Sequence, residues 1–206
     1  MSWVRTFGAL WIASILAGAL STLSPDIAAR HPRPFALPAL QPGDLVFIGV
    51  DSVFWAKAAS VWSTPEHRFG HVGVYALDTH GRPEIVHAGG SPTNGDAPVT
   101  AEPLGSYLAI ATRVGVYRVR AATPEARARI AAAALTFVDQ HAVFDSQFSL
   151  ADPHRLYCTA LAWRAALNAN NGDIAPRKSS IGGQTVVTLA DLEQSPRLQL
   201  IAFASR

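Results

Sequence analysis

The chain of 206 residues is long enough for one domain with a substantial hydrophobic core. Hydrophobic residues make up 49% of it and charged residues 16%, a composition that excludes intrinsic disorder. The 17 basic and 15 acidic residues nearly balance and the basic residues do not cluster, so nucleic acid is not an expected partner. The single cysteine excludes both an intramolecular disulfide and a multi-cysteine zinc site.

The first 29 residues have the pattern of an export segment. Arg5 precedes an uninterrupted run of apolar and small residues from Phe7 to Leu20, which is typical of a secretory signal peptide. Two other interpretations stay open: a retained membrane anchor, since Phe7 to Leu23 reaches the lower length limit for a membrane span, and a buried core helix. We expect residues 1–29 to be a signal peptide or an N-terminal membrane anchor. The protein is then periplasmic or in the cell envelope, and associated with the inner membrane if the segment is retained.

Strand patterns dominate the first half of the remaining chain. Residues 30–42 are rich in proline and are expected to form an extended linker into a domain that spans residues 43–206. Strands are expected at 44–50, 69–77, 83–88 and 111–119, the last with alternate residues facing opposite ways. The expected hairpin turn is His80-Gly81, the expected short helix is 54–62, and the expected loop is 89–103.

Helical patterns dominate the second half. Thr123 followed by Pro124 is typical of a helix start, and this helix is expected to end near Gln140. A second helix is expected at 156–168, a short helix after Thr188 and an edge strand at 198–203. Strands that come first and helices that come later predict an α+β fold, with a largely antiparallel sheet packed against helices.

Cys158 is the candidate nucleophile, because it lies at or near the start of the helix expected at 156–168. The free N–H groups and the positive dipole end at a helix N-terminus lower the pKa of a thiol and stabilise the oxyanion of a tetrahedral intermediate. An unpaired cysteine in an exported protein is either buried or used. On spacing alone, a small buried hydrophobic side chain stays open as the alternative.

Two histidines are the candidate base and its orienting partner. His71 lies between two glycines in the strand expected at 69–77, and His87 ends the return strand. A hairpin that closes near residues 80 and 81 brings the two side chains close together on one face of the sheet. Satisfied structural histidines and a zinc site formed with Cys158 are the other interpretations, although these residues lack the close spacing typical of zinc ligands.

Four motifs and their order give a family resemblance. They are QPGDLVF at 41–47, FGHVGVY at 69–75, IVHAGG at 85–90 and LYCTALAWRA at 156–165. This set resembles the NlpC-type papain-like cysteine hydrolases, but here the cysteine helix follows the histidine strands, whereas it precedes them in papain and in ordinary NlpC domains. The chain is therefore similar, over roughly residues 42–203, to the YaeF/YiiX group of circularly permuted papain-like amidases. The resemblance implies a circularly permuted papain-like fold with the nucleophile at a helix N-terminus.

The resemblance also implies roles for particular residues. Cys158 would be the nucleophile, His71 the general base, and His87 the residue that orients the imidazole of His71. A glutamate is often found at the third position in this group, and Glu84 is a poor substitute because strand alternation directs it to the opposite face. Tyr157 is the candidate for an additional oxyanion contact. Asp44 is expected to hold the loop beside the site, with a plain turn residue as an equal alternative.

These residues together lead to an expected activity. We expect a cysteine amidase or peptidase-like hydrolase of the cell envelope that forms a thioester intermediate and needs no metal or organic cofactor. The expected substrate is a small molecule, a peptide or a lipid acyl group, and the choice between a murein peptide and a lipid is open. A non-catalytic envelope ligand-binding domain on the same fold is the alternative from another class. The segment 54–62 is expected either to pack in the core or to line an apolar groove, and the sequence does not set the oligomeric state.

Overall fold

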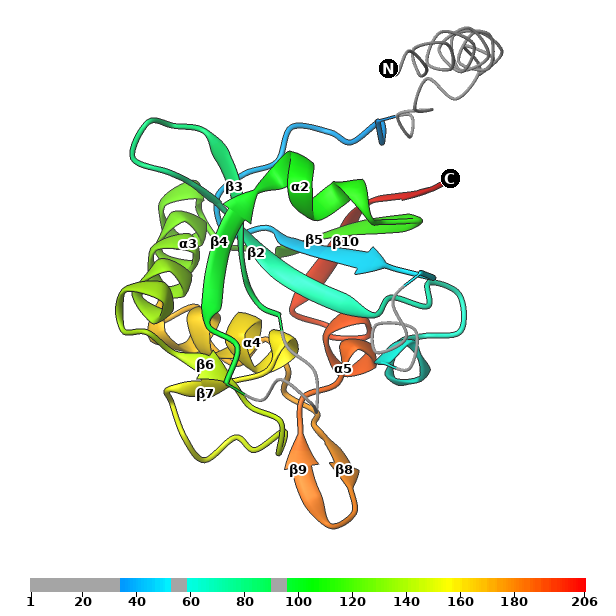
Figure 1. Cartoon of the computed structure of the whole chain (residues 1–206), viewed down its shortest axis with the longest axis vertical. Helices are drawn as coiled ribbons and strands as arrows, with labels where there is room; N and C mark the ends of the chain where they lie inside the picture. Colours follow the sequence, from blue (N-terminus) through cyan, green and yellow to red (C-terminus); the bar gives the residue numbers. More distant parts are fainter. Residues whose placement is uncertain (1–33, 53–58, 90–95) are drawn as a thin grey trace, which may run out of the picture. The chain divides into compact units, whose positions relative to one another are not determined.

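The computed structural model describes residues 34–52, 59–89 and 96–206, and its main feature is a large antiparallel sheet (Figure 1). The strand order is β10-β5-β1-β2-β3-β4, and each neighbouring pair is antiparallel. The strands are β1 (Leu45–Gly49), β2 (His71–Leu77), β3 (Pro83–Ala88), β4 (Val99–Pro103), β5 (Arg113–Val119) and β10 (Leu198–Ser205). The helices are α2 (Leu104–Ala109), α3 (Pro124–Asp139), α4 (Cys158–Asn168), α5 (Leu189–Glu193) and the 3-10 turn η2 (Ser60–Trp62). Two small pairs complete the described part: parallel β6 (Val143–Phe144) with β7 (Arg155–Leu156), and antiparallel β8 (Ser179–Ile181) with β9 (Gln184–Val186).

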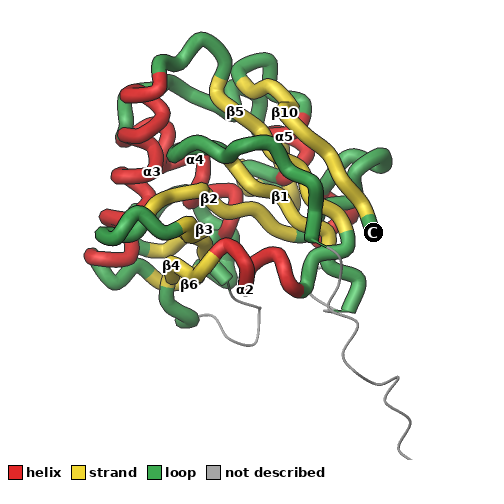
Figure 2. The backbone as a smooth tube through the Cα atoms, turned by 90° about the horizontal axis from the view of Figure 1, so that it is seen from above, coloured by secondary structure: helices red, strands yellow, loops and turns green. Residues whose placement is uncertain are grey.

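The sheet separates two hydrophobic clusters. On one face, α3 and α4 pack against strand residues such as Val72 and Tyr117. On the other face, Tyr107 of α2 packs with Val114 and Val116, and part of the Pro-rich segment, including Phe35, covers the same cluster (Figure 2). The alternation predicted for 111–119 is therefore confirmed, since even and odd residues of β5 enter different clusters. The predicted α+β class is confirmed as well.

Local capping explains where the main helices begin. The hydroxyl of Thr123 accepts a hydrogen bond from the N–H of Ala126, and Pro124 opens α3, as predicted. Thr188 and Asp191 form a reciprocal capping box at the start of α5. Helix α4 begins at Cys158, two residues later than expected, because Leu156 instead pairs with Phe144 of β6. This late start places the thiol on the first residue of the helix.

The loop predicted at 89–103 is wrong in part. Residues Val99–Pro103 form the edge strand β4, which pairs with β3 through Thr100 opposite His87 and Glu102 opposite Ile85. An edge strand tolerates a proline at its end because one side of its ladder has no partner. Residues 90–95 lie outside the described part of the chain.

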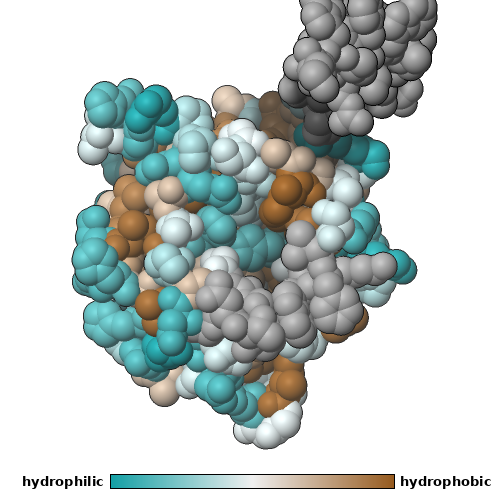
Figure 3. Space-filling model, in the orientation of Figure 1, coloured by the Kyte–Doolittle hydropathy of each residue, from teal (hydrophilic) through white to brown (hydrophobic). Residues whose placement is uncertain are grey.

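A small hairpin that the sequence patterns did not predict projects from the domain (Figure 1). It consists of β8 and β9, and its turn uses Gly182 and Gly183, both with positive φ. The surface over this hairpin is mixed, with a hydrophobic patch beside hydrophilic and neutral residues (Figure 3), and Ile181 is exposed. The Nε2 group of Gln184 donates to the backbone oxygens of Gln147 and Phe148, which ties the hairpin to the loop before α4.

Other expectations fall wholly or partly outside the described residues. The export segment at 1–29 lies outside them, as does most of the helix predicted at 54–62, including Trp55. Within the described ranges, no helix is long and apolar enough to cross a membrane.

Candidate active site

The Cys158 side chain lies at the N-terminus of α4, where backbone N–H groups gather around it. Tyr157 is the N-cap residue, and its side chain makes no capping hydrogen bond, so the first turn stays open to a ligand. The backbone N–H groups of Val72, Thr159 and Cys158 itself donate to the sulfur. The thiol is partly buried and also lines a cavity. This arrangement can stabilise negative charge on the sulfur and on an oxygen next to it.

The resting thiol nevertheless stays protonated. Burial raises the pKa of Cys158 to about 11, and the three backbone hydrogen bonds lower it by less. The helix N-terminus predicts a lowered pKa of the thiol, and this prediction is wrong because the desolvation of the sulfur dominates. The nucleophile therefore needs a base that removes its proton during the reaction.

His71 and His87 are in direct contact, as the hairpin geometry predicts. The Nε2 atom of His71 lies 2.9 Å from Nδ1 of His87, and the two rings are nearly perpendicular at 85°. Gly73 makes this contact feasible, since a Cβ there would lie 2.3 Å from Cγ2 of Ile85 and 3.1 Å from Cβ of His87. The absence of a side chain at Gly73 thus leaves room for Ile85 and His87 of β3 to approach β2, which brings the two imidazoles together.

The thiol and the histidine pair meet at the start of β2. The N–H group that reaches the sulfur from the sheet belongs to Val72, the residue after His71. The ring of His71 contacts His87 through Nε2, and its second nitrogen is Nδ1. Within the described residues, the groups that form hydrogen bonds to the sulfur are backbone N–H groups and neither imidazole is among them. The thiol therefore lies next to the residue that follows His71, and the catalytic roles of Cys158, His71 and His87 stay predictions.

Both imidazoles are neutral in the folded protein. Burial, followed by the proximity of His87, lowers the pKa of His71 to about 3. Burial lowers the pKa of His87 to about 4. A neutral imidazole keeps a nitrogen lone pair, which is what a general base requires.

These lowered pKa values predict a pH-dependent stability. An unfolded chain protonates its histidines near pH 6.5, while the folded chain excludes both protons until about pH 4 and about pH 3. The free energy of unfolding should therefore fall as the pH falls from about 6.5 to about 4, by up to about 1.4 kcal/mol per pH unit for each histidine. Urea unfolding of wild type and H71N at several pH values checks this, because H71N should lack the part of the pH dependence that His71 contributes. Equal slopes in the two proteins would contradict the prediction.

Glu102 joins the histidine pair and was not found from the sequence. Its Oε1 atom lies 2.9 Å from Nε2 of His87, and the Thr100 hydroxyl lies 3.4 Å from the same nitrogen. Glu84 faces away from the histidines, as predicted. It pairs with Ala76, whose side chain belongs to the hydrophobic cluster beneath α3 and α4. In the segment TAEP at 100–103, the polar residues Thr100 and Glu102 flank Ala101, and this alternation is typical of a strand. The turn-forming residues earlier in the predicted loop at 89–103 hide this pattern.

The Tyr157 hydroxyl has a backbone partner. It accepts a hydrogen bond of 2.8 Å from the N–H of Val187, and it also lines the cavity next to Cys158. This contact fixes the segment before α5 against the start of α4. An oxyanion contact from Tyr157 stays a prediction.

Asp44 lies at the far end of β1 from the histidines. Leu45 pairs with Val74, whereas Ile48 pairs with His71. The Asp44 side chain is fully buried and accepts hydrogen bonds of 2.7 and 2.8 Å from the guanidinium of Arg118. A role in holding the loop beside the site also stays a prediction.

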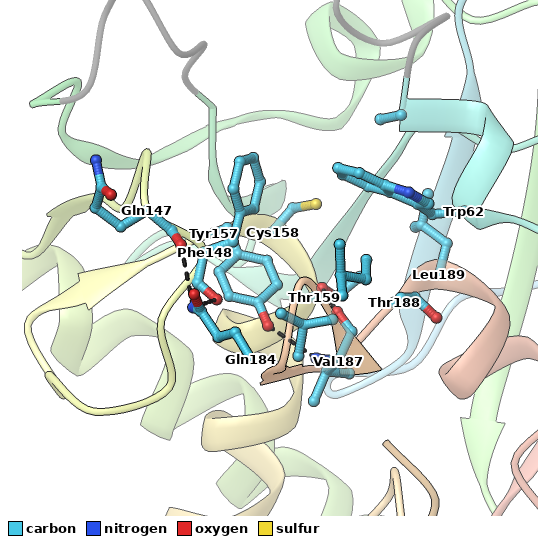
Figure 4. A pocket seen from close by; sticks show the side chains of 13 residues that line it. Trp62, Gln147, Phe148, Tyr157, Cys158, Thr159, Gln184, Val187, Thr188 and Leu189 are labelled. Carbon is cyan, nitrogen blue, oxygen red and sulfur yellow. Dashed lines mark hydrogen bonds between the residues drawn. The ribbon is translucent and has the colours of Figure 1, made fainter. Parts of the chain in front are cut away.

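The surface of the cavity beside Cys158 is mainly apolar, although Gln147, Thr159, Gln184 and Thr188 also line it (Figure 4). It has a volume of about 160 Å³, close to that of an engineered apolar cavity that binds benzene. The sulfur points into the space between Phe148 and Trp62, whose rings are 5.7 Å apart (Figure 4). Trp62 is 39% exposed and lines this cavity, so it is not part of the core. Its other apolar walls are Ile181, Val186, Val187 and Leu189.

The arrangement of these residues bears on metal binding as well. Within the described residues, no three His, Cys, Asp or Glu side chains are grouped so that they could hold a metal ion.

The chain thus has a cysteine at a helix N-terminus and a histidine pair on an antiparallel sheet, an arrangement that fits the papain-like fold. The helix follows the sheet strands in this chain, so the class is the circularly permuted one. The family described as permuted papain-like amidase enzyme, YaeF/YiiX, C92 family, matches residues 39–201, and the chain belongs to this family. Family and fold confirm the resemblance deduced from the four motifs.

A solved structure has the same fold. It is the crystal structure of the metalloprotein YiiX from Escherichia coli O157:H7, which is 20% identical and matches with a TM-score of 0.63. The match covers 81% of this chain and 98% of the other. A comparison with curated proteins gave no match.

Proposed function

We propose that the protein is a cysteine hydrolase that cleaves an amide or other acyl bond through a thioester on Cys158. The observation that carries this proposal is the position of the thiol. It sits on the first residue of α4, receives backbone N–H groups including that of Val72, and opens into an apolar cavity. Membership of a permuted papain-like amidase family supports a hydrolase of this kind.

The contacts of His71 support a general-base mechanism. Its Nδ1 atom takes the proton from the Cys158 sulfur, and the sulfur attacks the carbonyl carbon of the substrate. The oxyanion that forms is stabilised by N–H groups at the start of α4. His71 then gives the proton to the leaving amine or alcohol, which leaves a thioester. Water attacks the thioester with His71 again as base, and the acid and the free thiol are released.

The apolar cavity supports an acyl group that is itself apolar. Benzene fills a cavity of this size, so an aromatic side chain or a short aliphatic chain fits beside the sulfur. Charged carboxylates and amines of a murein peptide would lose hydration against Trp62, Phe148 and Leu189 without gaining partners. A murein peptide would therefore place its charged groups outside this cavity.

A lipid acyl hydrolase or acyltransferase is the second candidate, and the same apolar lining favours it. Incubation with phosphatidylcholine vesicles, followed by intact-protein mass spectrometry, tests this candidate. A fatty acyl adduct on Cys158 would support a lipid substrate, whereas an adduct from peptide amides alone would support an amidase.

The location of the reaction is part of the proposal. The apolar run from Phe7 to Leu20 supports export to the periplasm or cell envelope, either as a cleaved signal or as an anchor. Cell fractionation with N-terminal sequencing of the mature chain tests both outcomes.

Acyl trapping tests the proposed function directly. With p-nitrophenyl hexanoate as the probe, a hexanoyl adduct should form on Cys158, the chain's single cysteine, and neutral hydroxylamine should remove it. H71N should lower the acylation rate by about 100- to 10,000-fold, because general-base assistance is lost. The matched control H80N changes an exposed histidine in a turn and should acylate like wild type.

Two results would contradict the proposed function. One is saturable binding of the probe with no adduct, which would indicate the non-catalytic ligand-binding domain. The other is an adduct whose rate of formation is the same in H71N and H80N.

A further inference from the structure

We propose that Glu102 is a positioning residue that sets the tautomers of His87 and His71, so that Nδ1 of His71 is the atom that accepts the thiol proton. The inference rests on the proposed function and adds a fourth residue to Cys158, His71 and His87. Three contacts carry it: Glu102 Oε1 to His87 Nε2 at 2.9 Å, His87 Nδ1 to His71 Nε2 at 2.9 Å, and the thiol beside Val72.

Hydrogen-bonding capacity fixes the direction of this chain of contacts. An ionised carboxylate only accepts, so Nε2 of His87 must carry the hydrogen that lies between the two groups. A neutral imidazole carries one hydrogen, so Nδ1 of His87 is an acceptor. Nε2 of His71 then carries the hydrogen directed at it, and Nδ1 of His71 holds the lone pair. Without a carboxylate at the end, the reverse set of tautomers would be equally satisfied, and it would place a hydrogen on Nδ1 of His71.

The carboxylate also opposes the charge that forms during the reaction. When the thiol proton moves to Nδ1 of His71, that ring becomes positive in a largely buried setting. Glu102 offers a negative charge one imidazole away, and the His87 side chain between them is 13% exposed. Burial keeps the pKa of both imidazoles below the usual value, so a compensating anion lowers the energy of the protonated state.

Among the described residues around the pair, no group is an equal substitute for Glu102. Tyr107 of α2 faces both rings, at 5.9 Å from His71 and 5.4 Å from His87, but its hydroxyl donates to the backbone oxygen of Val46. The Thr100 hydroxyl on β4 lies 3.4 Å from Nε2 of His87, which is long for a hydrogen bond, and it carries no charge.

Two variants separate the hydrogen bond from the charge. E102M removes both the acceptor and the charge from a side chain that is one-third exposed, so it should fold. E102Q removes the charge and keeps a hydrogen bond, in which the amide can either accept from or donate to Nε2 of His87. The matched control is E84Q, on the opposite face of β3.

The first readout is the tautomer of each ring, measured by long-range proton–nitrogen NMR on histidine-labelled protein at pH 8. Wild type and E84Q should show hydrogen on Nε2 of both His71 and His87. E102M, and E102Q because its amide can also donate, should show a substantial share of hydrogen on Nδ1 of both rings. The second readout is acylation of Cys158 by p-nitrophenyl hexanoate, which should fall by about 10- to 100-fold in E102M and by less in E102Q.

Wild-type tautomers in E102M, or an acylation rate equal to that of E84Q, would overturn the inference. A purely structural role of Glu102 would lower the thermal midpoint without moving the tautomers. The NMR result does not depend on turnover, so it tests Glu102 even if the proposed function fails the acyl-trapping experiment.

Discussion

Replacing Cys158 by serine should lower kcat/KM for p-nitrophenyl hexanoate by about 10,000-fold or more. A hydroxyl is a far weaker nucleophile than a thiol, and His71 is arranged to remove the proton of a more acidic group. The serine oxygen can still accept the backbone N–H groups of Val72 and Thr159, so the free energy of unfolding should change by about 1 kcal/mol or less. Steady-state kinetics and urea unfolding measure the two effects.

The neighbouring residue offers a matched control for this experiment. The Thr159 hydroxyl donates to the backbone oxygen of Val187, and T159S keeps that hydroxyl. This variant should hydrolyse the probe at close to the wild-type rate. If C158S keeps a rate within tenfold of T159S, the thiol is not the nucleophile, and the hydrolysis occurs elsewhere in the protein.

The histidine pair could be predicted from the sequence because its geometry is local. Residues 71 and 87 flank a short hairpin, and strand alternation then decides which face their side chains share. Strand and helix patterns also located the main elements, and capping residues located the start of α3. The order of the motifs identified the permuted arrangement.

Glu102 could not be predicted because its position depends on pairing between strands that no local pattern specifies. Its strand follows a stretch rich in Gly, Pro, Asn and Asp, and Pro98 and Pro103 flank its core residues. Only the pairing of β4 with β3 brings its carboxylate to His87. The cavity could not be predicted for the same reason. Its walls come from segments that lie far apart in the sequence, namely η2, the loop before α4, the β8–β9 hairpin and the start of α5.

The pKa of Cys158 shows a second limit of sequence reasoning. The helix N-terminus could be predicted, and with it a contribution that lowers the pKa. The degree of burial could not be predicted, because it depends on side chains from distant segments, and it is the larger effect. Whether the pKa of Cys158 is raised or lowered therefore depends on the folded structure. Because it is raised, the thiol needs a general base to lose its proton.

Asp44 forms a buried ion pair with Arg118 at the end of β1 that lies away from the histidines. Replacing Asp44 tests whether this pair stabilises the fold or holds the site. Its side chain is fully buried, and its two oxygens accept from Nε and Nη2 of Arg118, while one also accepts from the N–H of Gln41. Removal of one member of such a pair leaves an uncompensated charge and unpaired donors, which is more costly than removal of both members.

We therefore expect D44A to lower the free energy of unfolding by about 3–5 kcal/mol, as measured by urea unfolding at pH 7. The control D96A breaks an ion pair with Arg155 at a carboxylate that is 81% exposed, and it should change stability by about 0–1 kcal/mol. R118M added to D44A should restore part of the loss, because no unpaired charge then remains. Acylation of Cys158 by the folded fraction should stay at the wild-type rate if Asp44 acts on the fold, since Asp44 lies at the opposite end of β1 from the strand position paired with His71. A stable D44A with slow acylation would instead assign Asp44 to the loop beside the site.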